Sequence, residues 1–277
     1  MKNILQLNII MVMNYRKSFK QFTLSIFFLF SIGLGINTAQ KNKLSDPKET
    51  EVWEPEPAIV SFNENNIPSD AIVLFDGTDL SKWQSAKGDG SPASWTINDD
   101  DSMTVTPGAG GIETIDEHGS VQLHLEWKAP QIVKGEGQGR GNSGVFFQRR
   151  YEVQILDSYD NRTYSNGQAA SIYKQYIPLV NATKSPQEWQ VYDIIFIEPT
   201  FDSEGNLKTK GRITVFHNGV LVQDNIKLLG TTEYIGAPKT GRDQMPGDGS
   251  ETRLDRKLYL QDHGDLVSFR NIWIRKL

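Results

Sequence analysis

Residues 139–157, with the sequence GRGNSGVFFQRRYEVQILD, carry the side chains whose types and spacing best suit chemistry. The second apolar run in this stretch, YEVQIL, alternates apolar residues with Glu152 and Gln154. A period of two places Glu152 and Gln154 on the same face of a half-buried strand. A carboxylate beside an amide on an open face could bind or cleave a polar ligand, although an ordinary solvated face has the same pattern.

Two other predicted strands carry acid–base side chains that we expect on the same face as Glu152. One strand contributes Glu126 together with His124, and another ends with Gln261 and His263 in the turn QDHG. Glu152 is the first candidate for a general base or a metal ligand, the alternative being a hydrogen-bonded structural carboxylate. His263 is a candidate acid/base group or ligand, because imidazole changes its charge near neutral pH.

Glu126 has two possible roles. It could act as a second carboxylate, or it could be the ion-pair partner of Arg140 or Arg270. Together with Glu152 and His263 it would offer carboxylate and imidazole ligands to a divalent ion such as zinc, manganese or cobalt. No HxH or HExxH spacing accompanies these residues, so the possible metal site has no local motif.

The glycine-rich turn at residues 139–144, just before the apolar run VFFQ, supplies further candidates for substrate binding. Asn142 and Ser143 could donate hydrogen bonds to substrate hydroxyls, or they could fix the turn by local bonds to the backbone. Glycine favours such a turn because it tolerates positive φ angles. Asp157 follows the second strand and could line the rim of a cleft.

Many short strands separated by turn residues must position these side chains. The Asn218-Gly219 pair predicts a tight hairpin within 212–223, and the runs 257–264 and 266–277 suggest another hairpin at the end of the chain. Only residues 166–176 suggest a turn or two of helix. The pattern predicts one all-β sandwich, and pairing of the C-terminal strands with early ones would make it a jelly roll. Further predicted strands are 71–75, 94–98, 102–106, 120–130 and 190–199.

Composition excludes several classes of protein. The chain has 277 residues and a formal charge of −5, which gives no reason to expect a nucleic-acid or anionic-membrane partner. There is no cysteine, so disulfides and a lipid-modified cysteine are excluded. A core alone can stabilise a domain of this size.

The N-terminal residues are typical of an export signal. Arg16, Lys17 and Lys20 precede the apolar run Phe22–Ile36, which is too short for a confident membrane span. We expect residues 1–39 to be a signal peptide, residues 40–69 a polar, proline-bearing tether, and residues 70–277 a single domain. The mature protein is then expected to be periplasmic or secreted, soluble, and free of the membrane.

Eight ordered motifs resemble one bacterial family. They are FDGTDLSKW, LEWK, GNSGVFFQ, YEVQILD, IYKQYIP, EWQVYDIIF, HNGVLVQ and LQDHGDLVSFRNIWIR, and they span residues 70–277. The family was long a domain of unknown function and is described as 3-keto-disaccharide hydrolase. The resemblance implies a concanavalin A-like jelly roll of two curved antiparallel sheets, with the site on the concave face. His124 and residues 236–251 depart from the pattern.

The resemblance also implies a substrate whose glucose unit is already oxidised to a ketone at C3. Such a ketone acidifies the hydrogen on C2, and the group on C1 can then be expelled in a lyase-like or hydratase-like route with net hydrolysis. This route needs a base near C2, an acid near the leaving oxygen, and donors at the enolate oxygen. Glu152 would be the base, and Arg140 could polarise the ketone. An upstream sugar 3-dehydrogenase is a necessary partner.

Two other functions remain open from the residues. A retaining glucanase would use Glu152 and Asp157 as its carboxylates, but Gln154 replaces the usual middle aspartate, and the aspartate at 157 is one methylene short. A non-catalytic carbohydrate-binding jelly roll would favour exposed aromatic side chains as stacking platforms. Most of the six tryptophans, including Trp127 and Trp273, fall on predicted buried faces or turns instead.

Overall fold

A computed structural model describes residues 46–247 and 255–277. The predicted signal peptide, residues 1–39, lies outside the described residues. Internal contacts divide the chain into one unit up to Ile59 and a second, compact unit from Val60 to Leu277. The described part of the first unit contains one 3₁₀ turn, η1 (Pro47–Thr50), capped by Asp46. Within the described ranges, no helix has the length and apolar character needed to cross a membrane.

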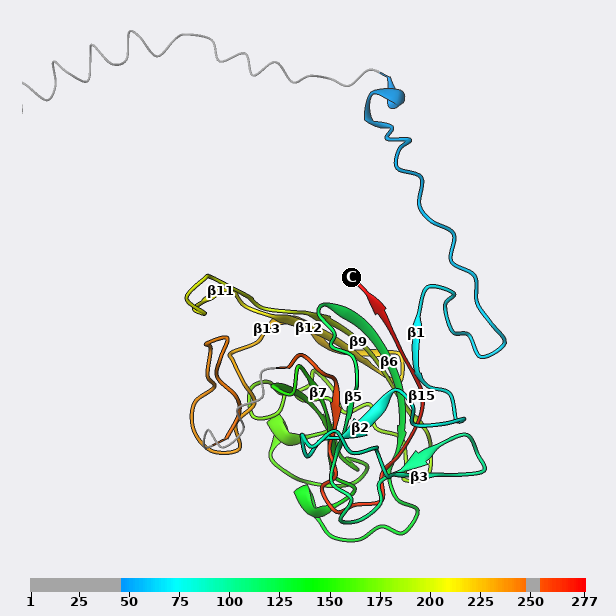
Figure 1. Cartoon of the computed structure of the whole chain (residues 1–277), viewed down its shortest axis with the longest axis vertical. Helices are drawn as coiled ribbons and strands as arrows, with labels where there is room; N and C mark the ends of the chain where they lie inside the picture. The colour runs from blue at the N-terminus through cyan, green and yellow to red at the C-terminus, as the bar shows by residue number, and fades with distance from the viewer. Residues whose placement is uncertain (1–45, 248–254) are drawn as a thin grey trace, which may run out of the picture. The chain divides into compact units, whose positions relative to one another are not determined.

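The larger sheet of the second unit has eight antiparallel strands in the order β13-β12-β9-β6-β15-β4-β3, with β1 also paired to β15. Figure 1 shows its long strands crossing the domain. Their bounds are β1 (Ile72–Phe75), β3 (Thr96–Ile97), β4 (Met103–Thr104), β6 (Val121–Lys128), β9 (Gln190–Ile197), β12 (Arg212–His217), β13 (Val220–Lys227) and β15 (Ser268–Lys276).

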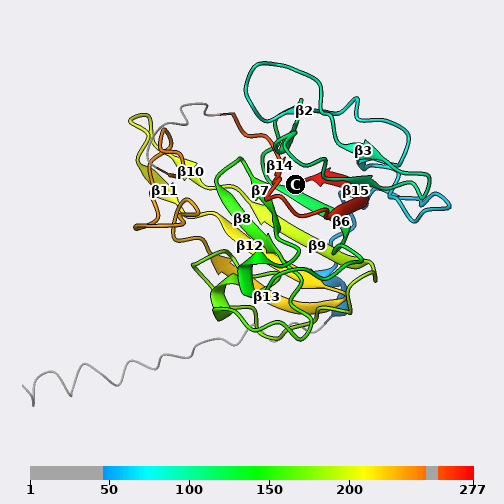
Figure 2. The ribbon, with the colours of Figure 1, turned by 90° about the horizontal axis from the view of Figure 1, so that it is seen from below.

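The smaller sheet has five antiparallel strands in the order β2-β5-β14-β7-β8 and lies across the core from the larger one (Figure 2). Its strands are β2 (Trp83–Ser85), β5 (Ile112–Thr114), β7 (Ser143–Phe147), β8 (Tyr151–Ile155) and β14 (Tyr259–Leu260). A separate hairpin joins β10 (Thr200–Phe201) to β11 (Leu207–Thr209), and two 3₁₀ turns are η2 (Gly137–Gly139) and η3 (Ser165–Gly167).

Apolar side chains from the facing sides of both sheets form one core. Strand β6 alternates buried and half-buried residues along its whole length, as its sequence predicts. Phe147 of the smaller sheet stacks on Phe196 of the larger one with ring centroids 4.6 Å apart. Tyr192, buried in the larger sheet, donates a 2.7 Å hydrogen bond to the carbonyl of Gln154. The predicted all-β jelly-roll sandwich is therefore confirmed.

The two predicted hairpins have different outcomes. Asn218 and Gly219 have φ angles of 53° and 78° and join β12 to β13, as expected for the tight turn. The prediction of a C-terminal hairpin is wrong, because β14 belongs to the smaller sheet and β15 to the larger. Strand β15 has nine residues and pairs with the long strand β6. Strand β14 has only two residues, too few to pair along the length of β15. The chain between β14 and β15 therefore crosses from one sheet to the other.

Strand β8 ends the smaller sheet, but its edge is covered. The backbone amide of Gln154 donates to the carbonyl of Ser171, and that of Tyr173 donates to the carbonyl of Glu152. Ala170 has a φ of 64°, which lets the chain turn onto this edge. The region that suggested a turn or two of helix thus contains only η3 before it continues as an irregular partner of β8.

Candidate functional site

A cavity of about 340 Å³ lies over the outer face of the smaller sheet, on the side of β8 away from the core. We call it the Glu152 cavity. The predicted residues Glu152, Gln154, Asn142, Gln261 and His263 all line it. Phe146, Tyr173, Thr232, Tyr234, Pro246 and Gly247 complete its walls. The loops after β8 and β13 cover the face of the sheet, so side chains that alternate away from the core are nevertheless shielded from water.

Glu152 is the most unusual ionisable group of this cavity. Its side chain is buried, and burial raises the pKa of its carboxyl group to about 8. None of the described residues donates a hydrogen bond to the carboxylate, and across the β7–β8 pair a Cβ added to Gly144 would lie 2.7 Å from Oε1. The backbone amide of Glu152 donates to Thr232 Oγ1 at 2.9 Å. The strand is thus fixed while the carboxylate remains free to act on a ligand.

Amide side chains form the polar floor next to Glu152. Gln154 Nε2 lies 3.3 Å from both Asn142 Oδ1 and Gln138 Oε1, and Asn142 Nδ2 donates to the Gln138 carbonyl at 2.7 Å. The Oε1 atom of Gln154 is buried and has no hydrogen-bond partner among the described residues. A ligand hydroxyl could satisfy this oxygen.

The chain after β14 supplies the opposite wall. Gln261 continues the pairing of β14 with β7, because its backbone amide donates to the carbonyl of Gly144. Ser143 does not line the Glu152 cavity; its Oγ donates to the Gln261 carbonyl at 2.7 Å and fixes this wall. His263 is exposed on the following turn and lines the same cavity as Glu152.

The expectation that Glu126 and His124 share a face with Glu152 is wrong, because β6 belongs to the other sheet. Glu126 Oε2 accepts a 2.7 Å bond from Arg270 Nε, so the ion-pair alternative with Arg270 describes its environment. His124 Nδ1 lies 2.7 Å from Asp193 Oδ1.

The two carboxylates among the candidate metal ligands also lie on different sheets. The set Glu152, His263 and Glu126 is not brought together, and the described ranges contain no group of three such side chains that could hold a metal ion.

Arg140 and Asp157 also lie away from the Glu152 cavity. Arg140 Nε donates to Asp157 Oδ2 at 2.7 Å, and its Nη2 donates to the Tyr159 carbonyl at 2.9 Å. Both side chains line a separate cavity of about 400 Å³ beside residues 129–134. Arg140 therefore does not line the cavity in which a ligand would contact Glu152.

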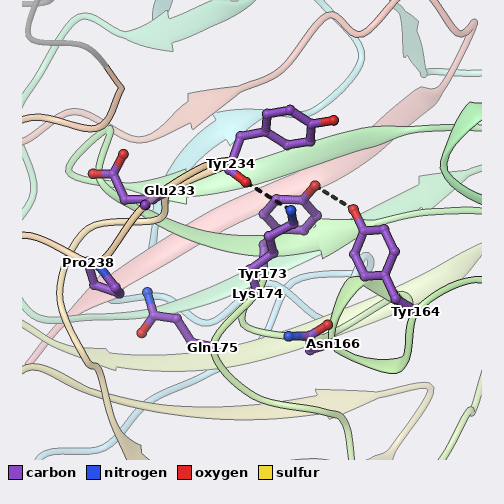
Figure 3. A pocket seen from close by; sticks show the side chains of 9 residues that line it. Tyr164, Asn166, Tyr173, Lys174, Gln175, Glu233, Tyr234 and Pro238 are labelled. Atoms are coloured by element: carbon purple, nitrogen blue, oxygen red, sulfur yellow. Dashed lines mark hydrogen bonds between the residues drawn. The ribbon is translucent and has the colours of Figure 1, made fainter.

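A group of tyrosines near Glu152 was not predicted from the sequence. Tyr164, Tyr173 and Tyr234 border a second cavity of about 450 Å³, which we call the tyrosine cavity (Figure 3). These residues lie on long loops without a strand period, so alternation could not place them. The density of tyrosine in residues 164–176 could have indicated a binding site, because tyrosines clustered on loops often contact a ligand.

Comparisons with known proteins agree with this architecture. A family model described as a 3-keto-alpha-glucoside-1,2-lyase-like domain matches residues 70–275. A curated Bacteroides thetaiotaomicron protein named 3-keto-disaccharide hydrolase is 27% identical over 258 residues, covering 76% of this chain and 81% of the relative. A crystal structure of a candidate glycosyl hydrolase from Parabacteroides distasonis is 45% identical, has a TM-score of 0.76, and covers 84% of this chain and 97% of its own.

Replacing Glu152 by glutamine should stabilise the fold at alkaline pH. The carboxyl group has a pKa of about 8 in the folded state, above its ordinary value of 4.5, so the folded state holds the proton more tightly than the unfolded state. Burying the ionised form therefore costs more as pH rises from about 4.5 to 8, and removing it should add ~1–3 kcal/mol at pH 8 but little at pH 5. Urea unfolding of both proteins at the two pH values measures this. Glu64→Gln, at an exposed glutamate, controls for the lost charge, and an equal gain from Glu152→Gln at both pH values would contradict the prediction.

His124 should contribute stability that is lost as pH rises. Burial lowers its pKa, but hydrogen bonds and charges from Asp193 and Glu126 outweigh burial and raise the pKa to about 9. The contribution is complete below the ordinary pKa of 6.5 and is lost as pH rises through about 9. The loss of unfolding free energy caused by His124→Gln should therefore be larger at pH 6 than at pH 10, as chemical denaturation would show. A loss that does not change with pH would mean that His124 acts only through packing against Trp273.

Proposed function

The chain belongs to the 3-keto-alpha-glucoside-1,2-lyase-like domain family, and from this premise we propose that it cleaves 3-keto-glycosides, 3-keto-disaccharides among them. The proposed route removes the proton on C2, expels the group on C1 and ends in net hydrolysis. Membership of this family and the curated relative support an enzyme that cleaves glycosidic bonds. The residues of the Glu152 cavity support the more specific reaction.

Glu152 would remove the C2 proton. A carboxylate whose pKa is raised to about 8 is a stronger base than an ordinary carboxylate, and its operating range lies close to neutral pH. The C2–H electrons form the C1–C2 double bond as the C1–O bond breaks, and the departing oxygen takes the electron pair and a proton. Water then adds to the unsaturated keto sugar, which completes the hydrolysis.

The other polar side chains of the cavity would bind the keto sugar. Asn142, Gln154 and Gln261 offer amide groups to the sugar hydroxyls and to the oxygen that gains charge as C2 loses its proton. His263 is placed at the wall of the same cavity, where an imidazole could donate to that oxygen or exchange protons with water. These roles need no second carboxylate.

Among the described residues, Glu152 is the only carboxylate that lines its cavity, and this supports the proposed reaction most strongly. Direct retaining hydrolysis needs a pair of carboxyl groups about 5–5.5 Å apart across the scissile bond. Asp157, which the glucanase hypothesis would use as the acid, is bound to Arg140 and lines another cavity. A single desolvated base suits proton abstraction next to a ketone better than direct glycosidic cleavage.

The proposed substrate requires an earlier oxidation. A 3-keto-glycoside forms when a sugar 3-dehydrogenase oxidises the C3 hydroxyl, so such an enzyme must supply the substrate. Export of this chain to the periplasm or outside the cell, with residues 1–39 as its signal, remains a prediction of the sequence.

The purified protein should release the leaving group from a 3-keto-glucoside and not from the unoxidised parent glucoside. Glu152→Gln should lower kcat by ~10²–10⁴-fold, because it removes the base. In the unmodified protein kcat/KM should rise with pH through about 8 as Glu152 ionises. Leaving-group release at a series of pH values measures both effects, and a parallel series with a chelator tests for a divalent ion.

Three results would contradict the proposal. Cleavage of the parent glucoside would favour a glucanase, and binding of both sugars without cleavage would favour a carbohydrate-binding module. Full turnover of the keto sugar by Glu152→Gln would remove Glu152 as the base.

A further inference from the structure

Tyr173 lies between the two cavities on the outer face of the smaller sheet. It lines both the Glu152 cavity and the tyrosine cavity, and Tyr234 is the other residue that they share. Under the function proposed above, the keto sugar occupies the Glu152 cavity. Its C1 substituent must then leave through a neighbouring space, and the tyrosine cavity adjoins the Glu152 cavity at these shared residues.

The hydroxyl of Tyr173 is held in place by its neighbours. It lies 2.6 Å from the hydroxyl of Tyr164, and Figure 3 shows the two phenols meeting end to end. The backbone amide of Tyr173 donates to the carbonyl of Glu152, so the phenol and the proposed base are anchored to the same strand position. Gly167 leaves room for the partner ring, because a Cβ there would overlap Tyr164.

We propose that the tyrosine cavity receives the leaving group as a second sugar ring, and that the Tyr173 hydroxyl donates the proton to the departing oxygen. This inference rests on the function proposed above. It supplies a proton donor for the leaving oxygen. Elimination requires one, and Glu152, the only carboxylate that lines its cavity among the described residues, cannot provide it while it acts as the base.

These groups alone account for every proton and electron pair that moves in the elimination. Glu152 takes the C2 proton, the C2–H electrons form the double bond, and the C1–O electrons move to the leaving oxygen. Tyr173 gives that oxygen its proton and becomes a phenolate, which accepts a hydrogen bond from the Tyr164 hydroxyl. A proton then passes from Glu152 to Tyr173, directly or through water, and restores both groups.

The chemistry of a phenol fits this step. A sugar alkoxide is much more basic than a phenolate, so transfer from tyrosine to the leaving oxygen is downhill. Burial, the hydrogen bond with Tyr164 and the nearby charge of Glu152 all raise the pKa of Tyr173. The phenol therefore keeps its proton across the pH range in which Glu152 ionises.

The walls of the tyrosine cavity suit a sugar ring. Tyr234 is 70% exposed, and aromatic faces of this kind pack against the C–H faces of pyranose rings. Lys174 Nζ lies 4.5 Å from the centroid of the Tyr234 ring and donates to the Tyr234 carbonyl at 2.8 Å. Asn166 adds an amide that can bind hydroxyls, and Figure 3 shows it below the tyrosines. The cavity thus combines aromatic faces with polar donors.

Two substrates with different leaving groups test the role of Tyr173. Sugar release from a 3-keto-disaccharide needs a proton, whereas 4-nitrophenolate leaves a 4-nitrophenyl 3-keto-glucoside without one. Tyr173→Phe should lower kcat on the disaccharide by ~10²–10³-fold and on the nitrophenyl substrate by less than tenfold. Tyr164→Phe should show the same selectivity with a smaller loss. Tyr176→Phe is the matched control, because Tyr176 belongs to the same loop, donates to the Lys227 carbonyl and lines neither cavity; it should leave both rates unchanged.

The outcomes separate this inference from the function on which it rests. If the unmodified protein cleaves neither keto substrate, the proposed function fails and the inference with it. If the unmodified protein cleaves both, equal losses on the two substrates in Tyr173→Phe would show that Tyr173 positions the sugar and would overturn its role as the acid. An unchanged rate on the disaccharide would overturn it as well. Thermal unfolding of each variant establishes that the compared proteins are folded.

Discussion

The candidate site depends on keeping one carboxylate away from water without giving it a charged partner. An ionised carboxylate loses much of its hydration when it is buried, and a protein usually offsets this loss with a cation or several donors. Glu152 has neither among the described residues, and burial raises its pKa to about 8. The surrounding fold supplies the necessary stability: Thr232 Oγ1 accepts from the backbone amide of Glu152, the amide of Tyr173 donates to its carbonyl, and the core packs beneath the strand.

A second ionisable cluster, around Glu126 on the opposite sheet, contrasts with Glu152 in the direction of its pKa shift. Glu126 is also partly buried, but hydrogen bonds from His124, Asn271 and Arg270 outweigh its burial and lower its pKa to about 2. Such a carboxylate is a weak base and is already occupied by its partners. The two glutamates come from strands with the same alternation, yet their surroundings give them opposite properties. Pairing makes Glu126 structural in character, and isolation makes Glu152 suited to proton transfer.

The sequence predicted local features better than long-range ones. The alternation in β6 and β8 identified which side chains face away from the core, because a period of two is a property of the strand itself. It could not say which sheet each strand joins, so Glu126 and Glu152 were expected together and lie on different sheets. The C-terminal hairpin failed for the same reason. Tyr173 and Tyr234 escaped prediction because their positions depend on loops folding over β8, which no local period encodes.

In the proposed reaction, Glu152 acts first by removing the proton on C2. A 3-keto-glucoside carrying deuterium at C2 tests this most directly, because only a route that breaks the C2–hydrogen bond is sensitive to the label. We expect a primary kinetic isotope effect on leaving-group release and a product whose C2 deuterium has been replaced by hydrogen from the solvent. Cleavage at an unchanged rate, with the deuterium retained at C2 in the product, would contradict it.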